Sequence, residues 1–138
     1  MTAQAGYSGT PLPRKLGIKP GHRVLLSGAP ASFDLGQVDG VELHRRPGRA
    51  PYDVVLAFCP DLATLERRFV PLTTRLVPDG GMWVAWPKRS SGVPTDLDEN
   101  VVREVGLAAG LVDNKVCAVD AVWSGLRFVY RLRDRPAR

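Results

Sequence analysis

Apolar residues are grouped along the chain in short runs that predict β-strands. Residues 53–59 are apolar at nearly every position, and so are residues 82–86, which stop at Pro87. A strand that is apolar on both faces belongs in the middle of a covered, usually parallel sheet. Shorter strands are predicted at residues 22–27 and, half exposed, at residues 41–45.

Between these runs the apolar residues recur at steps of three and four, which predicts amphipathic helices. One helix should follow Asp61, which can cap it, and should kink or break at Pro71, which has no N–H to donate. A second should follow Thr95 as its cap and end at Gly110. A short helix capped by Thr10 and a single helical turn at 31–36 are also predicted. The inner stripes are Leu62, Leu65, Phe69, Leu72 and Leu76 in the first helix and Leu97, Val101, Val105 and Ala108 in the second.

The chain finishes with two strand-like runs, residues 115–120 and 126–132, joined by a turn that contains Trp123-Ser124-Gly125. A short turn between two strands makes a hairpin, which is antiparallel. Strands that alternate with helices predict an α/β fold. We therefore expect residues 10–138 to form one Rossmann-like domain, a mostly parallel sheet covered by helices and ending in an antiparallel β-hairpin. Residues 1–9 should form a flexible arm, and residues 46–52, too short for a crossover helix, could form an extended strap.

Composition limits the class of protein. Of 138 residues, 44% are hydrophobic and 24% are charged, which is typical of one globular domain. No apolar stretch approaches the roughly 20 residues of a membrane span, and no signal-like apolar core is found near the N-terminus. We therefore expect a cytoplasmic protein with no membrane partner. The net charge of +5 suits a polyanionic partner.

Cysteine and histidine give no sign of a metal centre. Cys59 and Cys117 lie in apolar runs, where a free thiol behaves as a small hydrophobic side chain. Neither His22 nor His44 has a second ligand at metal-binding spacing, so no metal is expected. The Ser90-Ser91-Gly92 stretch lacks the elbow of a nucleophilic serine. The catalytic residues, if the chain has any, are not indicated by its sequence.

The second half of the chain resembles the class I methyltransferases. The stretch "LVPDGGMWVAWPK" is similar to the helix end, turn and strand of that superfamily, and "VVREVGLAAGLVDNKV" followed by "WSGLRFVYRL" is similar to its last helix and terminal hairpin. More narrowly, "GYSGTPLPRKLGIKPG", "VAWPKRSSGVPTDLDENVVREVGLAAGLVDNKV" and "SGLRFVYRL" resemble a small bacterial family of single-domain proteins with no established activity. The first resemblance implies a Rossmann-like fold and S-adenosylmethionine as cofactor.

Two departures from that superfamily bear on the cofactor. Where the resemblance implies a glycine-rich turn after the first strand, this chain has Ser27-Gly28-Ala29-Pro30. Where it implies an acidic residue after the second strand, this chain has Arg45-Arg46, with Glu42 as the nearest acid. We therefore expect no cofactor, and keep S-adenosylmethionine as the alternative.

One candidate ligand site lies where three predicted parallel strands end. Ligands of open α/β sheets bind beyond these carboxyl ends, so loops 28–30, 59–61 and 86–91 should form a mouth for a small anion or nucleotide. Its prolines could instead simply end strands, while its cations pair with nearby acids. The candidate ligand-binding residues are Gly28, Ala29, Cys59, Asp61, Lys88, Arg89, Ser90 and Ser91.

The last predicted strand offers a second candidate surface. Leu126, Phe128, Tyr130 and Leu132 alternate with Arg127, Val129, Arg131 and Arg133. Arginines beside an aromatic side chain could bind RNA or a protein partner. They could instead merely keep a strand near the sheet edge from pairing with other chains. The candidate residues for nucleic acid or partner are Trp123, Arg127, Arg131 and Arg133. The arm at residues 6–9 could also cover a pocket as a lid.

The favoured function is a non-catalytic module that binds a small anion or nucleotide, or a protein, with a homodimer as one arrangement. A divergent S-adenosylmethionine-dependent methyltransferase is the first alternative. An RNA-binding accessory protein is the second. Binding of S-adenosylmethionine, and salt-sensitive binding of RNA, would distinguish the three.

Overall fold

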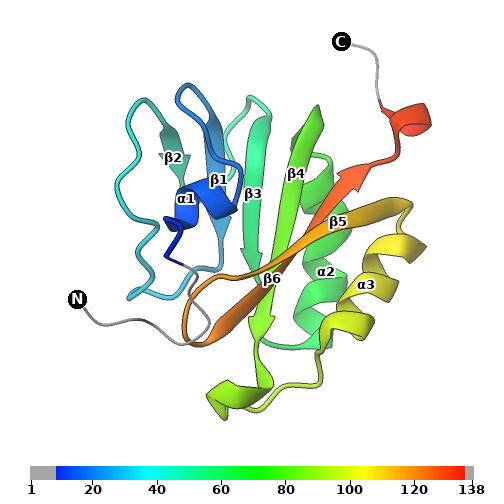
Figure 1. Cartoon of the computed structure of the whole chain (residues 1–138). Helices are drawn as coiled ribbons and strands as arrows, with labels where there is room; N and C mark the ends of the chain where they lie inside the picture. The colour runs from blue at the N-terminus through cyan, green and yellow to red at the C-terminus, as the bar shows by residue number, and fades with distance from the viewer. Residues whose placement is uncertain (1–8, 136–138) are drawn as a thin grey trace.

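The computed structural model describes residues 9–135, and one six-stranded sheet forms its centre (Figure 1). The strands are β1 (Arg23–Ser27), β2 (Glu42–His44), β3 (Tyr52–Phe58), β4 (Leu76–Pro87), β5 (Leu111–Ala118) and β6 (Trp123–Tyr130). Their order in the sheet is β2-β1-β3-β4-β6-β5. The first four in this order are parallel, whereas β6 is antiparallel to both β4 and β5. The predicted fold class, a mostly parallel sheet that ends in an antiparallel hairpin, is confirmed.

The two faces of the sheet are covered unequally. The helices α2 (Leu62–Thr73) and α3 (Glu99–Ala108) pack on one face, which we call the helix-covered face. The opposite face carries the four-residue helix α1 (Leu12–Lys15) and the connection 28–41, from which Phe33 and Leu35 are buried against the sheet. Figure 1 shows this second, helix-poor face toward the viewer, with α1 in front of the sheet and α2 and α3 behind it.

The middle of the sheet is built by β3 and β4. Apart from Asp53, every residue of β3 is buried, as its continuous apolar run predicts. Residues 77–80, predicted as a turn, belong to β4, which pairs with β3 across a shift of register after Tyr52. A β-carbon on Gly80 would lie 3.0 Å from the Asp53 carbonyl oxygen, so glycine allows the two strands to approach there.

The helix α2 runs through Pro71 instead of breaking at it. Pro71 is the third residue from the end, so the hydrogen bond that it lacks is lost in the last turn, where the helix is about to stop. The hydroxyls of Thr73 and Thr74 donate to the carbonyls of Val70 and Pro71. Leu76, predicted on the helical stripe, is instead the first residue of β4.

Four other predictions are wrong. Asp98, not Thr95, caps α3, because its carboxylate accepts the Val101 N–H at 2.8 Å. Pro11, not Thr10, is the residue that directly precedes α1. Residues 31–36 form no helical turn. Residues 123–125 lie within β6, and the hairpin turns at residues 119–122, where Asp120 accepts two backbone N–H groups.

The short edge strand β2 explains how residues 45–51 connect two parallel strands without a helix. It pairs with the first half of β1, from Arg23 to Leu25, so its end lies near the start of β3. His44 Nδ1 and Tyr52 Oη are 2.6 Å apart across this connection. The strap therefore need not return along the sheet.

The predicted arm at residues 1–9 lies outside the described residues, apart from Gly9. Within residues 9–135, no helix has the length and apolar character needed to cross a membrane.

Candidate functional site

The loops that follow β1, β3 and β4 lie together at one edge of the sheet, the lower edge in Figure 1. The strand register sets Ser27 beside Ala57 and Phe58 beside Ala85, so the three strands end at similar levels. The structure thus brings together loops 28–30, 59–61 and 86–91, which we call the mouth. Whether a ligand binds there depends on the space and the polar groups that they leave.

The side of the mouth next to α2 is closed by an arginine. Gly28 has a left-handed backbone with φ of 70°, and a β-carbon built on it would lie 2.3 Å from Arg68 Nη1. Arg68 Nη1 also donates a hydrogen bond of 2.8 Å to the Phe58 carbonyl oxygen. The guanidinium therefore occupies the space beside the one glycine of the β1 loop.

The helix-poor side of the mouth is closed by aromatic rings. Phe33 and Trp123 both meet Phe58 edge to face, with ring centroids 4.9 Å and 5.1 Å away. Open α/β sheets bind ligands in the crevice where the strand order reverses, which in this chain lies between β1 and β3. Arg68 and these rings fill that crevice from its two sides.

The segment that leads into α3 folds over the loop after β3. Thr95 Oγ1 donates to the Pro60 carbonyl at 2.7 Å, and Asp96 accepts the N–H of Leu62, the first residue of α2, at 2.8 Å. The positive end of α2 is thus already neutralised by a carboxylate. A neighbouring cavity of about 270 Å³ contains Arg89 together with the α3 cap, Asp98.

The two candidate residues after β3 have structural roles. Cys59 is buried, and burial raises the pKa of its thiol to about 11, so the nucleophilic thiolate is disfavoured. Asp61 caps α2 by accepting the Thr64 N–H at 2.8 Å, and hydrogen bonding by the Thr64 side chain and by this N–H lowers the pKa of its carboxyl. Ala29 is half-buried and packs against the core of the helix-poor face.

The candidate residues after β4 form one short 3₁₀ turn, η1 (Arg89–Ser91). The Ser91 hydroxyl donates to the Lys88 carbonyl at 2.6 Å and accepts from Val93 N–H, so both of its roles are met within the loop. Lys88 is half-buried, and Arg89 and Ser90 are exposed. Two cations and one hydroxyl of this loop are thus at least partly open to solvent.

These residues do not fit S-adenosylmethionine in the manner that the fold implies. Gly28, the one glycine of the β1 loop, is exposed, but the Arg68 guanidinium occupies the space beside it. The end of β2 lies level with Leu25, whereas β1 continues to Ser27, so β2 stops short of the mouth. Glu42 begins β2 and is bound to Arg23 and His44.

The predicted second surface is divided by the fold. Trp123 is half-buried against Phe58, so its ring is not presented as a stacking platform. Because β6 ends at Tyr130, Arg131 and Arg133 lie beyond the sheet, at and within the 3₁₀ turn η2 (Leu132–Asp134), and Leu132 is exposed rather than in the core. Of the predicted arginines, Arg127 alone lies on the sheet.

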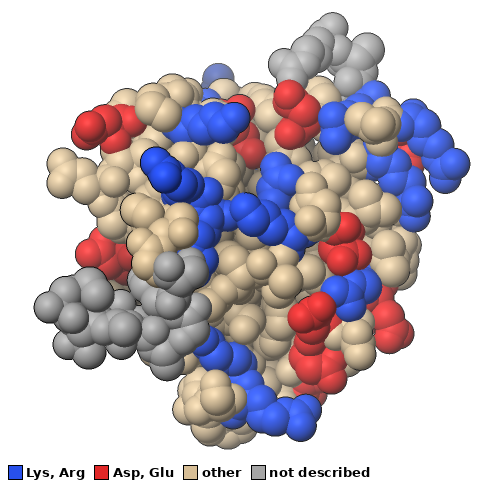
Figure 2. Space-filling view, in the orientation of Figure 1, with Lys and Arg blue, Asp and Glu red and all other residues tan. Residues whose placement is uncertain are grey.

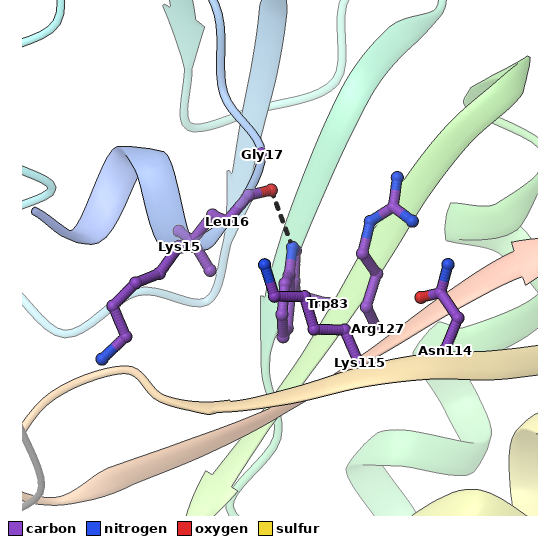
Figure 3. A pocket seen from close by; sticks show the side chains of 7 residues that line it. All are labelled: Lys15, Leu16, Gly17, Trp83, Asn114, Lys115 and Arg127. Atoms are coloured by element: carbon purple, nitrogen blue, oxygen red, sulfur yellow. Dashed lines mark hydrogen bonds between the residues drawn. The ribbon is translucent and has the colours of Figure 1, made fainter. Parts of the chain in front are cut away.

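Arg127 lines a pocket that sequence reasoning missed. The pocket has a volume of about 180 Å³, lies on the helix-poor face, and is bounded by α1 on one side and by β5 and β6 on the other. In Figure 3, Arg127 and Asn114 lie on one side of Trp83, the Lys115 side chain extends across Trp83 toward Leu16, and Lys15 points away from the pocket. We call it the basic pocket. Its lining residues are Lys15, Leu16, Gly17, Trp83, Asn114, Lys115 and Arg127.

A β-bulge produces the basic pocket. Asp113 pairs with Phe128 and Lys115 pairs with Arg127, so Asn114 is an extra residue in β5. Two residues of the bulged strand therefore oppose one residue of its partner, and Asn114 and Lys115 both lie beside Arg127. The run Asp113-Asn114-Lys115 is polar within an apolar strand, which is the signal that could have located the bulge.

No group of three or more His, Cys, Asp or Glu side chains within residues 9–135 could hold a metal ion. Cys59 and Cys117 are both free thiols. They lie in the cores of opposite faces of the sheet.

Comparison with solved structures assigns the fold. The chain is similar to a candidate methyltransferase from Thermoplasma acidophilum (TM-score 0.53, 11% identity, 83% of this chain and 70% of that one). It is also similar to the N-methyltransferase NodS from Bradyrhizobium japonicum WM9 (TM-score 0.52, 12% identity, 83% and 88%). TrmN from Thermus thermophilus matches with a TM-score of 0.54 and 16% identity over 88% of this chain, which spans about half of TrmN (47%).

No protein-family model and no curated protein sequence matches the chain. The structural likenesses define a methyltransferase-like, Rossmann-like fold, as the sequence resemblance implied. At 11–16% identity they carry the fold alone, and not the activity of those proteins.

Proposed function

We propose that this chain is a non-catalytic binding module that has the methyltransferase fold without its cofactor site. Its ligand is a small anion. One observation carries the proposal: Arg68, Phe33, Phe58 and Trp123 occupy the crevice between β1 and β3 in which a ligand of this fold would bind.

The chemistry of the mouth supports the same conclusion. Cys59 holds its proton, and Asp61 and Asp96 are bound to helix N-termini. A general base needs a free acceptor within hydrogen-bond reach of the proton that it removes. The thiol of Cys59 offers none, and Asp61 and Asp96 each use one carboxylate oxygen to hold the start of α2.

Isothermal titration of the full chain with S-adenosylmethionine and S-adenosylhomocysteine tests the proposal. We expect no heat of binding at millimolar ligand. Micromolar binding of either compound that is lost in Gly28→Val would contradict it. Circular dichroism of this variant is the control, because valine disfavours the left-handed backbone at this position.

A divergent methyltransferase is the second candidate, and the strand order together with the likeness to methyltransferases favours it. It requires Arg68 and the aromatic rings to move apart when the cofactor binds. Incubation with S-adenosylmethionine labelled in the methyl group, in the presence of cell extract as a source of acceptors, tests this function. Label transfer above that of a heat-denatured sample would establish it.

A further inference from the structure

The basic pocket contains two like charges that directly oppose each other. Lys115 and Arg127 are paired residues of the β5–β6 hairpin, and both line the pocket. Like charges at directly opposite positions destabilise a strand pair. No Asp or Glu side chain lines this pocket to offset them.

Arg127 is the more unusual of the two. It is half-buried, and among residues 9–135 it has no hydrogen-bond or ion-pair partner. Burial lowers the pKa of its guanidinium, and the neighbouring Arg135 lowers it further, although an arginine stays charged. A charge that is partly removed from water without a partner is unfavourable, so an anion bound to it would be stabilised.

The sequence makes room for this guanidinium. A β-carbon on Gly81 would lie 2.3 Å from Arg127 Nε and 2.5 Å from its Cζ. Gly81 lies in the interior of β4, where glycine weakens a strand and often marks a close approach. Here the missing side chain lets the guanidinium lie against the strand instead of extending into solvent.

Figure 2 shows lysine and arginine side chains gathered across the upper part of the helix-poor face. The neighbouring cavity, of about 200 Å³, shares Arg127 and Gly17 with the basic pocket and is lined by Lys19, Asp53 and Asp79. Asp53 accepts the backbone N–H of Arg23 at 2.8 Å. Arg127 thus lies between the two cavities: Asp53 and Asp79 line only the neighbouring one, and no Asp or Glu side chain lines the basic pocket.

We propose that the basic pocket binds a small phosphate-bearing anion, held by the Arg127 guanidinium, the Lys115 ammonium and the Asn114 side-chain amide. A guanidinium matches the geometry of phosphate oxygens, and a lysine adds a point charge. This inference rests on the proposed function, to which it adds a site and a ligand class.

The pocket favours a small anion over RNA. Single-stranded RNA binds through bases that stack on exposed aromatic rings. The ring of Trp83 is fully buried, and its Nε1–H donates to the Leu16 carbonyl at 3.0 Å. Trp123 packs on Phe58. A pocket of about 180 Å³ is also below the usual size for a drug-sized ligand, about 300–1,000 Å³, and suits one or two phosphate groups.

The test is isothermal titration of the full chain with pyrophosphate, inorganic phosphate and adenosine monophosphate in low-salt buffer. Arg127→Met removes the charge but keeps much of the side-chain length. Arg89→Met makes the same change in an exposed arginine of the mouth and is the matched control. Arg127→Lys keeps the charge without the planar fork.

We expect pyrophosphate to bind the wild type with a dissociation constant below about 1 mM. Arg127→Met should weaken binding by about tenfold or more, Arg127→Lys by less, and Arg89→Met by less than about twofold. If adenosine monophosphate and phosphate bind equally, the phosphate group alone is recognised; tighter binding of the nucleotide would extend the site to its nucleoside.

Three results would overturn the proposal. The first is that none of the three probes binds at a concentration tenfold above about 1 mM, the upper limit expected for the dissociation constant. The second is pyrophosphate binding that Arg89→Met weakens and Arg127→Met does not, which would move the site to the mouth. The third is a single-stranded RNA that binds far more tightly than pyrophosphate and depends on Arg131 and Arg133.

Failure of this inference and failure of the proposed function can be told apart. Binding of S-adenosylmethionine together with normal pyrophosphate binding would refute the non-catalytic module and leave the basic pocket. If neither S-adenosylmethionine nor pyrophosphate binds, the proposal of a filled mouth stands and the proposal of a phosphate site in the basic pocket is refuted.

Discussion

The mouth and the basic pocket each have an arginine that lies against a glycine, Arg68 against Gly28 and Arg127 against Gly81, but the two arginines differ in their partners. At the mouth, Arg68 donates to the Phe58 carbonyl, and the carboxylates of Asp61 and Asp96 accept from α2. In the basic pocket, Arg127 is paired with Lys115 across the hairpin, and no Asp or Glu side chain lines the pocket. The position of a loop at the carboxyl edge of a sheet is therefore weaker support for a site than charge that the fold leaves without a partner.

The largest expected effect comes from emptying the filled crevice. Phe58→Ala removes the ring between Phe33 and Trp123 and should lower the free energy of unfolding by about 3–5 kcal/mol. Urea unfolding measures it. A loss below about 1 kcal/mol would show that the crevice is loosely filled, and the contrast with the basic pocket would then disappear.

Removing the arginine that closes the mouth should have a smaller effect. Arg68→Met leaves the Phe58 carbonyl without its side-chain donor, so we expect a loss of about 1–3 kcal/mol in the free energy of unfolding. Arg67→Met, at an exposed position one residue earlier on α2, is the control and should change it by less than about 0.5 kcal/mol. Equal effects of the two variants would contradict a closing role for Arg68.

The same type of substitution should have the opposite sign in the basic pocket. In buffer without phosphate, Arg127→Met removes one of two opposed like charges and should leave stability unchanged or raise it by about 0.2–1 kcal/mol. Thermal unfolding at low salt measures the change. A clear loss of stability would mean that Arg127 supports the fold rather than a ligand.

The smallest effect concerns access to the mouth. Burial raises the pKa of the Cys59 thiol to about 11, so alkylation by iodoacetamide at pH 8 should modify the half-buried Cys117 before Cys59. Because the folded state holds this proton more tightly than the unfolded chain, its contribution to stability is full below about pH 8.5 and is lost as the pH rises toward 11. Mass spectrometry of the alkylated peptides identifies the order, and prior modification of Cys59 would indicate an open mouth.

Most of the fold was predictable because the strands and helices carry their own patterns. The apolar run of β3 and the stripe of α2 give those elements within a few residues. The errors arose where long-range pairing decides: residues 77–80 look like a turn but lie within β4, at its register shift against β3, and residues 123–125 look like a turn but pair with β4.

The site was less predictable, since it depends on contacts between distant residues. The three loops of the mouth follow from strand order, but Arg68 on a helix gives no sign that it will lie against Gly28. Arg127 was correctly placed on the last strand. The residues that surround its side chain are supplied by the β5 bulge and by Gly81, and local propensity specifies neither of these.

The most direct test of the central claim, that a ligand binds in the basic pocket and not at the mouth, uses the indole N–H signals of the three tryptophans in a ¹H–¹⁵N spectrum. Trp83 lines the basic pocket, Trp86 lines the cavity beside Arg89, and Trp123 packs on Phe58. During titration with pyrophosphate, the Trp83 signal should move and the other two should stay in place. Movement of Trp86 or Trp123 with a fixed Trp83, or no movement at all, would contradict the account.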